Sequence, residues 1–392
     1  MKNFQKSYIS HRARSTPPSG IGEIFNRAIM LEDVVHLEVG EPDFDTPQHI
    51  KNAGCTAIQE GYTHYTHSRG DLELREAVVE YYRREYEVNI SSEDVIISLG
   101  GIASLMLSLL AISDVEDEIL IPDPGYPPYA SLVRIIGAKP VRYPVYEKNG
   151  YLPRVEDLEK RIGEKTKAVI INTPNNPTGV SYPMELLVEI AWLVKNYDIF
   201  LLSDEVYERF TYDGIKHHTT LELPGMENNL IVINSFSKTY AMTGWRLGFL
   251  VSRNEDITQT LDGLQGYTLI SSSSMAQRAG IAALLESQEA TERMKEEYEE
   301  RRNLLISLLE DIPDIDFVKP TGAFYLFLNI SKYSMDSYSF ADGLLRSKKV
   351  AVAPGATFGT HGEGHIRLSF TTSKERIKKG VERLKEYLLK MS

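Results

Sequence analysis

The chain contains little cysteine and no long apolar run. Cys55 is the one cysteine in 392 residues, so an internal disulfide framework is excluded; we expect Cys55 to be a small packed residue. The longest apolar stretch, 102–112, is interrupted by serines and is far shorter than a bilayer span. No apolar core of the signal-peptide type follows the first residues. These absences predict a cytoplasmic protein with no membrane partner.

Positive charge is also scarce. The 43 lysines and arginines are outnumbered by 55 aspartates and glutamates, which leaves a formal net charge of -12. An excess of this sign disfavours nucleic-acid partners, and any anion site must be built from a few local basic side chains. Neither a Gly-x-x-x-x-Gly-Lys-Ser/Thr loop nor a Gly-x-Gly-x-x-Gly turn after a strand is present. The sequence therefore gives no support for a nucleotide cofactor.

Short runs of β-branched residues recur through the middle of the chain, with helical patterns between them. The runs are 95–98, 118–121, 139–143, 168–172, 199–203, 230–234 and 247–251. This alternation predicts an α/β fold with a mostly parallel seven-stranded sheet between layers of helices. Because the link between the last two runs is too short for a helical crossover, we expect the last strand to be antiparallel.

After about residue 285 the pattern changes to a smaller α+β arrangement. A long charged helix over 286–311 is followed by a strand at 324–328, a helix near 337–347, a strand at 366–370 and a helix over 374–389. We therefore predict a large cofactor-binding domain over 46–285. The small domain would combine 1–45 with 286–392.

A lysine segment directly follows the predicted strand 230–234. It reads Ser235-Phe236-Ser237-Lys238, with Arg246 eight residues beyond the lysine. Strand ends are where open α/β sheets bind ligands, and a lysine of lowered pKa can form a Schiff base with an aldehyde. The two serines and the arginine could hold a phosphate. Pyridoxal phosphate carries both groups, although a surface lysine beside a polar turn is the alternative for such a common tetrapeptide.

Two further strand ends carry polar side chains suited to the same cofactor. Asn176 follows the strand 168–172, and Asp204 and Tyr207 follow the strand 199–203. An aspartate against the pyridine nitrogen would keep the ring protonated and able to accept electrons. Asn176 and Tyr207 could donate hydrogen bonds to the phenolic oxygen of the ring. Three strand ends with complementary groups are a demanding coincidence for packing alone.

Several ordered motifs together identify a family resemblance across essentially the whole chain. They are the segments 39–47, 62–65, 175–179, 203–207, 235–238, 322–325 and 366–369. With them the chain resembles the class I and II aminotransferases of pyridoxal-phosphate fold type I. It is most similar to the branch with prokaryotic aspartate and aromatic aminotransferases. The resemblance implies amino transfer from an L-amino acid to a 2-oxo acid by a ping-pong mechanism.

The resemblance also assigns roles to individual residues. Lys238, Asp204 and Tyr207 match the catalytic residues, and Gly40, Asn176 and Arg367 match the substrate-binding residues. The residues that match the site of pyridoxal 5'-phosphate are Gly101, Ile102, Tyr126, Asn176, Asp204, Tyr207, Ser235, Ser237, Lys238 and Arg246. Tyr65 matches a tyrosine that reaches the phosphate in the neighbouring subunit, which implies a homodimer.

No metal is predicted. His64 and His67 have no cysteine or carboxylate that completes a metal set. His217 with His218, and His361 with His365, are likewise interpreted as surface or loop residues. Tyr325 and Phe358 could contact the substrate or could pack in the core, and the sequence favours neither interpretation.

The preferred amino donor stays open at this point. In part of the family a partner-subunit arginine binds the distal carboxylate of dicarboxylic substrates, but the corresponding stretch 267–274 has no basic residue. Strict aspartate specificity is therefore not expected. Arg69 could serve instead, or could be a solvated surface residue. Aromatic, branched and small neutral donors remain possible.

Two other functions occur on the same scaffold. A carbon-sulfur β-lyase would release pyruvate and ammonia without an oxo acid. An aminotransferase-like ligand-sensing regulator would need an additional DNA-binding domain, and the segment before the Gly40 motif is too short to supply one.

Overall fold

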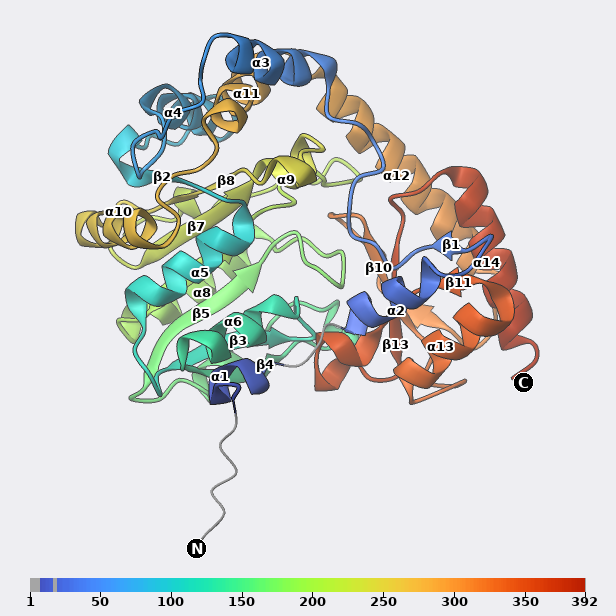
Figure 1. Cartoon of the computed structure of the whole chain (residues 1–392). Helices are drawn as coiled ribbons and strands as arrows, with labels where there is room; N and C mark the ends of the chain where they lie inside the picture. Colours follow the sequence, from blue (N-terminus) through green and yellow to red (C-terminus); the bar gives the residue numbers. More distant parts are fainter. Residues whose placement is uncertain (1–7, 17–19, 392) are drawn as a thin grey trace, which may run out of the picture.

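The centre of the protein is a seven-stranded sheet (Figure 1). The structure is a computed structural model that describes residues 8–16 and 20–391. Across the sheet the strand order is β2-β8-β7-β6-β5-β3-β4. The strands are β2 (Val95–Ser98), β3 (Glu118–Asp123), β4 (Lys139–Pro144), β5 (Thr166–Asn172), β6 (Phe200–Asp204), β7 (Leu230–Ser235) and β8 (Gly248–Val251). Their ends differ from the predicted runs by at most two residues.

The strand directions follow from the lengths of the connections. Strands β3 to β7 pair in parallel, whereas β8 pairs antiparallel with both β7 and β2. Only the short helix α9 (Phe236–Thr239) and the turn η4 (Thr243–Trp245) connect β7 to β8. This link is too short to return the chain to the opposite end of the sheet, and the prediction of an antiparallel last strand is confirmed.

Helices bury both faces of the large sheet. Side chains alternate along each strand, so Ile170 and Leu202 pack on one face while Val169 and Leu201 pack on the other. The first face is covered by α5 (Gly101–Ile112), α6 (Pro128–Ile136) and α10 (Glu255–Thr268). The second is covered by α4 (Leu72–Tyr86), α8 (Met184–Asn196) and α11 (Ser274–Leu285). Burial on both faces explains the nearly continuous apolar character of the strands.

A second, smaller sheet has its own hydrophobic core. Its strands are β12 (Ala353–Pro354), β13 (His365–Ser369), β10 (Tyr325–Asn329) and β9 (Asp316–Phe317), in that order and antiparallel. The helices α12 (Glu289–Leu309), α13 (Ser337–Lys348) and α14 (Lys374–Leu388) contribute to this core. The N-terminal elements α2 (Gly20–Ala28) and β1 (Val35–His36) join it, and β1 pairs with β11 (Val350–Ala351). We propose that this unit is the small domain, with boundaries at 45/46 and 285/286.

The remaining elements lie before α2 or in the connections between the strands and helices described above. They are α1 (His11–Arg14), α3 (Gln48–Gln59), α7 (Val155–Glu159) and the short turns η1 (Ser92–Asp94), η2 (Glu147–Asn149), η3 (Thr220–Glu222), η5 (Gly355–Phe358) and η6 (Thr360–Gly362). Helix α3 lies along α11 at the top of Figure 1. Within residues 8–16 and 20–391, no helix combines the length and apolar composition that spanning a bilayer requires.

The expectation that Cys55 is packed was wrong. Helix α3 buries Ile50, Gly54 and Ala57, which lie on one stripe at helical spacing, and Cys55 falls outside that stripe. Its thiol is exposed. Residue type alone suggested burial, but the face of the helix decides it.

The central strand β6 offers a direct test of this core. Leu202 is fully buried between β6 and the α5 layer, so Leu202→Ala should lower the free energy of unfolding by about 2–5 kcal/mol. The exposed Val188→Ala on α8 is the matched control and should change it by less than about 0.5 kcal/mol. Denaturant titration of the cofactor-free proteins measures both. Equal losses would show that Leu202 does not lie in the core.

Candidate active site

A cavity of about 230 Å³ opens at the carboxyl ends of β5, β6 and β7. It is lined by Gly101, Ile102, Leu105, Tyr126, Tyr129, Asn172, Asn176, Asp204, Val206, Tyr207, Ser235, Ser237, Lys238, Thr243 and Arg246. Every residue that the sequence assigned to the cofactor site of this chain's own subunit lines this one cavity. Carboxyl ends of neighbouring parallel strands meet at the same edge of a sheet, which explains why segments far apart in sequence converge here.

Lys238 enters the cavity from the first turn after β7. Ser235 is the N-cap of α9 and accepts a hydrogen bond from Ser237 N at 3.2 Å, which fixes the turn. The amine of Lys238 donates to the carbonyl oxygen of Gly40 at 2.7 Å. Burial lowers the pKa of Lys238 to about 8, so a useful fraction of the amine is neutral near physiological pH. A neutral amine in a cavity is a nucleophile and a proton acceptor.

Asp204 is the last residue of β6 and is buried in the cavity wall. Its carboxylate accepts a hydrogen bond from Tyr129 Oη at 2.6 Å and a longer one from Val206 N at 3.3 Å. Burial raises the pKa of Asp204 to about 6, although these hydrogen bonds favour the charged form. A cationic ring nitrogen beside Asp204 would restore its negative charge. No sequence pattern indicated that Tyr129 would contact Asp204. The one available signal was that Tyr129, on α6, lies three residues after Tyr126.

Asn176 and Tyr207 meet at one side of the cavity. The side-chain amide of Asn176 approaches Tyr207 Oη at 3.5 Å, and Tyr207 Oη lies 2.9 Å from Tyr325 Oη. Burial raises the pKa of Tyr207, which therefore stays a neutral hydroxyl able to donate a hydrogen bond. Tyr325 comes from β10 of the small sheet, so the two sheets contact each other at this point.

An anion-binding corner lies at the start of α5. Gly100 has a φ of 86° and leaves the first turn of α5 without a side-chain cap. A Cβ there would approach Arg246 Nη2 to 2.8 Å, so the backbone needs glycine to let the guanidinium come this close. The hydroxyls of Ser235 and Ser237 lie 3.0 Å apart beside it. Free N–H groups, two hydroxyls and a guanidinium fit a phosphate.

Arg367 lies on β13 opposite this corner. Its Nη1 donates to Asn176 Oδ1 at 3.0 Å, and its Nη2 donates to the carbonyl oxygen of Glu38. The guanidinium stacks on Tyr325 at 4.3 Å and on Phe358 at 5.1 Å. Its Nε is buried without a hydrogen-bond partner among the described residues. An unpaired buried donor of this kind fits a bound carboxylate, because leaving it unpaired costs free energy.

A family model named aminotransferase class I and II matches residues 32–384. The chain belongs to this family. This aminotransferase is 43% identical to an aspartate aminotransferase of Pyrococcus horikoshii, with 99% of each chain covered. It is 40% identical to aromatic-amino-acid aminotransferase 2 of Thermococcus litoralis, with 97% of this chain and 98% of the relative covered.

Solved structures agree with the sequence comparison. An aspartate aminotransferase from Thermus thermophilus with maleate has a TM-score of 0.92 and 34% identity, covering 97% of this chain and all of that one. An aromatic aminotransferase from Pyrococcus horikoshii has a TM-score of 0.89 and 38% identity, covering 94% of this chain and 99% of the other. The fold prediction of an α/β aminotransferase of fold type I is confirmed.

Two predicted residues lie outside the cavity of the chain that carries them. Tyr65 is 80% exposed in the loop between α3 and α4. Arg69 follows it, but its guanidinium pairs with Glu93 at 2.8 Å and with Asp262 at 3.2 Å. These ion pairs hold Arg69 against α10 and favour a structural role over binding of a substrate carboxylate.

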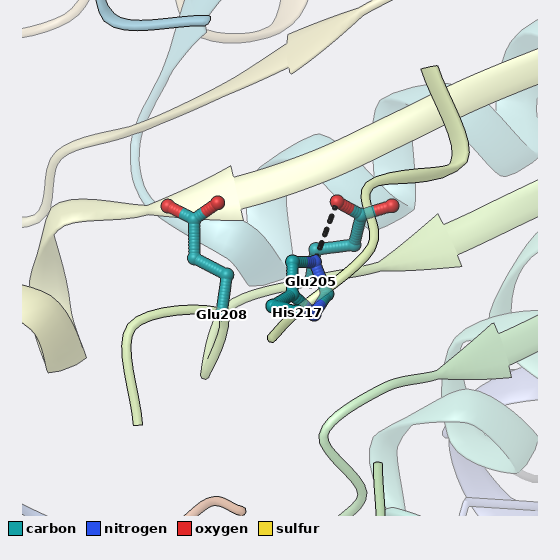
Figure 2. Close-up of side chains that lie close together, drawn as sticks. All are labelled: Glu205, Glu208 and His217. Atoms are coloured by element: carbon teal, nitrogen blue, oxygen red, sulfur yellow. Dashed lines mark hydrogen bonds and ion pairs between the residues drawn. The ribbon is translucent and has the colours of Figure 1, made fainter. Parts of the chain in front are cut away.

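Figure 2 shows a buried cluster of two carboxylates and an imidazole, formed by residues that follow β6 in the chain. Glu205, Glu208 and His217 place their ligand atoms within 4.8 Å of one another, a spacing that could hold a metal ion. Their oxygens already have partners, however. Glu205 accepts from Ser203, Thr220 and His217, and Glu208 accepts from two buried tyrosines, Tyr81 and Tyr86. The cluster is therefore satisfied as a hydrogen-bond network.

Two of the histidines interpreted as surface or loop residues are largely enclosed. His217 lies in a loop as expected, but it is buried because its Nε2 pairs with Glu205 at 3.2 Å. Burial is the largest single influence on Glu205 and opposes its charge, but the hydrogen bonds from His217, Thr219 and Thr220 and the charge of His217 together outweigh it, so the pKa of that carboxyl is lowered. His365 begins strand β13 and stacks on Phe327 at 4.9 Å, so it is not a surface residue either.

The raised pKa of Asp204 predicts a pH-dependent stability. Between about pH 4 and pH 6 the folded protein holds a proton on Asp204 that the unfolded chain has lost, so stability falls as the pH rises. Asp204→Asn removes the titrating carboxyl, so the variant should not lose stability in this way as the pH rises. In the cofactor-free protein, the advantage of the variant in unfolding free energy should grow by about 2 kcal/mol from about pH 4 to about pH 7. Denaturant titrations at both pH values measure it, and a constant difference would contradict the shift.

Proposed function

We propose that this aminotransferase moves an amino group from an L-amino acid to a 2-oxo acid with pyridoxal 5'-phosphate bound in the cavity. The observation that carries the proposal is a lysine amine of lowered pKa facing a buried aspartate and an anion-binding corner in a single cavity. Class I and II aminotransferases generally depend on this cofactor. The reaction would run as ping-pong, with the two substrates using the site in turn.

The described residues fit each part of the cofactor. Lys238 would bond to the aldehyde carbon, and Asp204 would pair with the pyridine nitrogen. Asn176 and Tyr207 would donate to the phenolic oxygen, and Tyr126 would stack on the ring. The phosphate would be held by the residues of the anion-binding corner, which are Gly101, Ile102 through its backbone, Ser235, Ser237 and Arg246.

When bound, the cofactor supplies a ring that withdraws electrons from the substrate α-carbon. The protein supplies orientation and proton transfer. Arg367 would bind the α-carboxylate with its planar fork, helped by the backbone of Gly40, and so fix the direction of the bond to the α-proton. Lys238 Nζ, displaced from the aldehyde carbon by the amine of the donor, would take that proton and pass it to the same carbon, and it would carry a proton in the opposite direction in the second half of the reaction. Its lowered pKa suits both directions of transfer.

A homodimer would complete the site. Tyr65 presents an exposed phenol in a loop away from its own cavity, as expected for a side chain that reaches the phosphate in a partner subunit. Tyr267 in the last turn of α10 is 95% exposed and Ile270 in the connection between α10 and α11 is 50% exposed, which supports an interface there. We propose a cytoplasmic location because a chain with one cysteine cannot form the internal disulfides that are common in secreted proteins.

The donor is proposed to be an aspartate or aromatic amino acid, or a broad set of both. Relatives named for aspartate and for aromatic amino acids match this chain to a similar extent. Arg69 is paired with Glu93 and Asp262, so it offers no support for a dedicated site for a distal carboxylate. The names of the relatives favour amino transfer over the carbon-sulfur lyase and the ligand-sensing regulator.

Replacement of Lys238 tests the proposal. Lys238→Ala should reduce kcat with every donor by at least about a thousandfold, because it removes both the covalent anchor and the proton acceptor. Lys332→Ala is the matched control, since its exposed amine pairs with Asp314 at the surface and should leave turnover unchanged. A screen of donors, with oxo-acid formation as the readout, measures the effect. Pyruvate and ammonia released without an oxo-acid acceptor would instead indicate the lyase.

A further inference from the structure

Asp123 is a buried carboxylate that lies outside the cavity and accepts hydrogen bonds from a loop of the small sheet. It is the last residue of β3, which lies between β5 and the edge strand β4 of the large sheet, and it is 1% exposed. Its Oδ2 accepts from Thr360 N at 3.2 Å and from Thr360 Oγ1 at 2.6 Å, and its Oδ1 accepts from His361 N at 3.0 Å. Three donors from two consecutive residues therefore converge on one carboxylate.

The loop approaches the carboxylate too closely for a side chain between them. Gly359 has a φ of 138°, and a Cβ at this position would overlap Asp123 Oδ1. Only glycine therefore allows this contact. The charges near Asp123 are Arg142, whose Nη1 lies 3.8 Å from Oδ2, and His361, whose Nδ1 lies 3.3 Å away. The side chains of Arg142 and His361 are partly exposed. The hydrogen bonds from the loop are therefore the buried interactions of the Asp123 carboxylate.

The same loop carries Phe358, which lies beside the proposed carboxylate site. Phe358 immediately precedes Gly359, and its carbonyl oxygen accepts from Gly125 N at 2.9 Å. Its ring is buried and lies 5.1 Å from the Arg367 guanidinium. The end of β3 thus fixes the backbone on both sides of Gly359. These contacts also fix the Phe358 ring against the Arg367 guanidinium. Arg367 itself is on β13, which follows η6 in the chain.

We propose that Asp123 is a positioning residue for the substrate carboxylate. By holding Thr360 and His361, it keeps Phe358 against Arg367 and aims the guanidinium at the position of the α-carboxylate. The inference rests on the proposed role of Arg367. It predicts that loss of the Asp123 contact weakens binding of carboxylates while the chemistry at Lys238 stays unchanged.

Asp123→Asn keeps the size of the side chain but turns an NH2 group toward an N–H or O–H donor. In the cofactor-loaded enzyme, KM for the amino donor should rise about tenfold, which corresponds to about 1.4 kcal/mol, while kcat changes by less than about twofold. The Kd of 3-phenylpropanoate, a carboxylate without an amino group, should also rise about tenfold when measured by calorimetry. The cofactor's absorbance and Kd should not change.

A second pair of variants keeps the test valid if Asp123→Asn folds poorly. Thr360→Val removes the hydroxyl donor and should raise the Kd of 3-phenylpropanoate by about threefold or more, whereas Thr360→Ser keeps the hydroxyl and should match the wild type. An unchanged Kd and KM in Thr360→Val and in folded Asp123→Asn would overturn the inference. Weaker cofactor binding in place of weaker carboxylate binding would also overturn it, because Asp123 would then act through the nearby Tyr126.

The failure of the proposed function has a different signature. Arg367→Lys should weaken binding of 3-phenylpropanoate more than either Asp123→Asn or Thr360→Val, because lysine cannot reproduce the fork of donors. Equal binding by Arg367→Lys and the wild type would remove the assumed carboxylate site itself, and the inference about Asp123 would fall with it.

Discussion

The hydrogen bond from Arg367 Nη1 to Asn176 Oδ1 joins the two sheets at the cavity. Asn176 follows β5 of the large sheet, and Arg367 lies on β13 of the small one. Through its amide nitrogen, Asn176 also approaches Tyr207, so one side chain connects the proposed carboxylate site with the proposed ring site. The relative position of these two sites depends on this bond. The Tyr325 ring stacks on the Arg367 guanidinium and adds a second contact to this connection.

Burial moves the two central titratable groups in opposite directions. The pKa of Lys238 falls to about 8 and the pKa of Asp204 rises to about 6, so the amine loses its proton more easily and the carboxyl holds its proton longer. Both shifts reduce the charge enclosed by the cavity. A cofactor with a cationic ring nitrogen would favour ionised Asp204, and its aldehyde would consume the neutral amine of Lys238. The environment is thus suited to the proposed cofactor before it binds.

Much of the fold could be predicted from local patterns. The β-branched runs marked all seven strands of the large sheet, and the short link before Leu247 marked the antiparallel one. The residues at the strand ends could be placed together because parallel strands end at the same edge. Partners supplied by tertiary packing could not be predicted. Tyr129 on α6 donates a hydrogen bond to Asp204 at the end of β6, and no periodicity in the sequence encodes that contact.

The features that local sequence patterns missed have the same physical origin. Cys55 is exposed because the buried stripe of α3 passes beside it, and His217 is buried because Glu205 lies across the loop. The close approach of Gly359 to Asp123 is also set by segments more than two hundred residues apart. Local sequence specifies the elements and their ends, whereas the contacts between distant segments decide which side chains are enclosed.

The most direct test of the central claim is chemical trapping at residue 238. Protein loaded with pyridoxal 5'-phosphate would be reduced with borohydride, digested, and its peptides identified by mass spectrometry. The account predicts a phosphopyridoxyl group on the amine of Lys238. A stable label on a different lysine, or no covalent label after full loading, would contradict it.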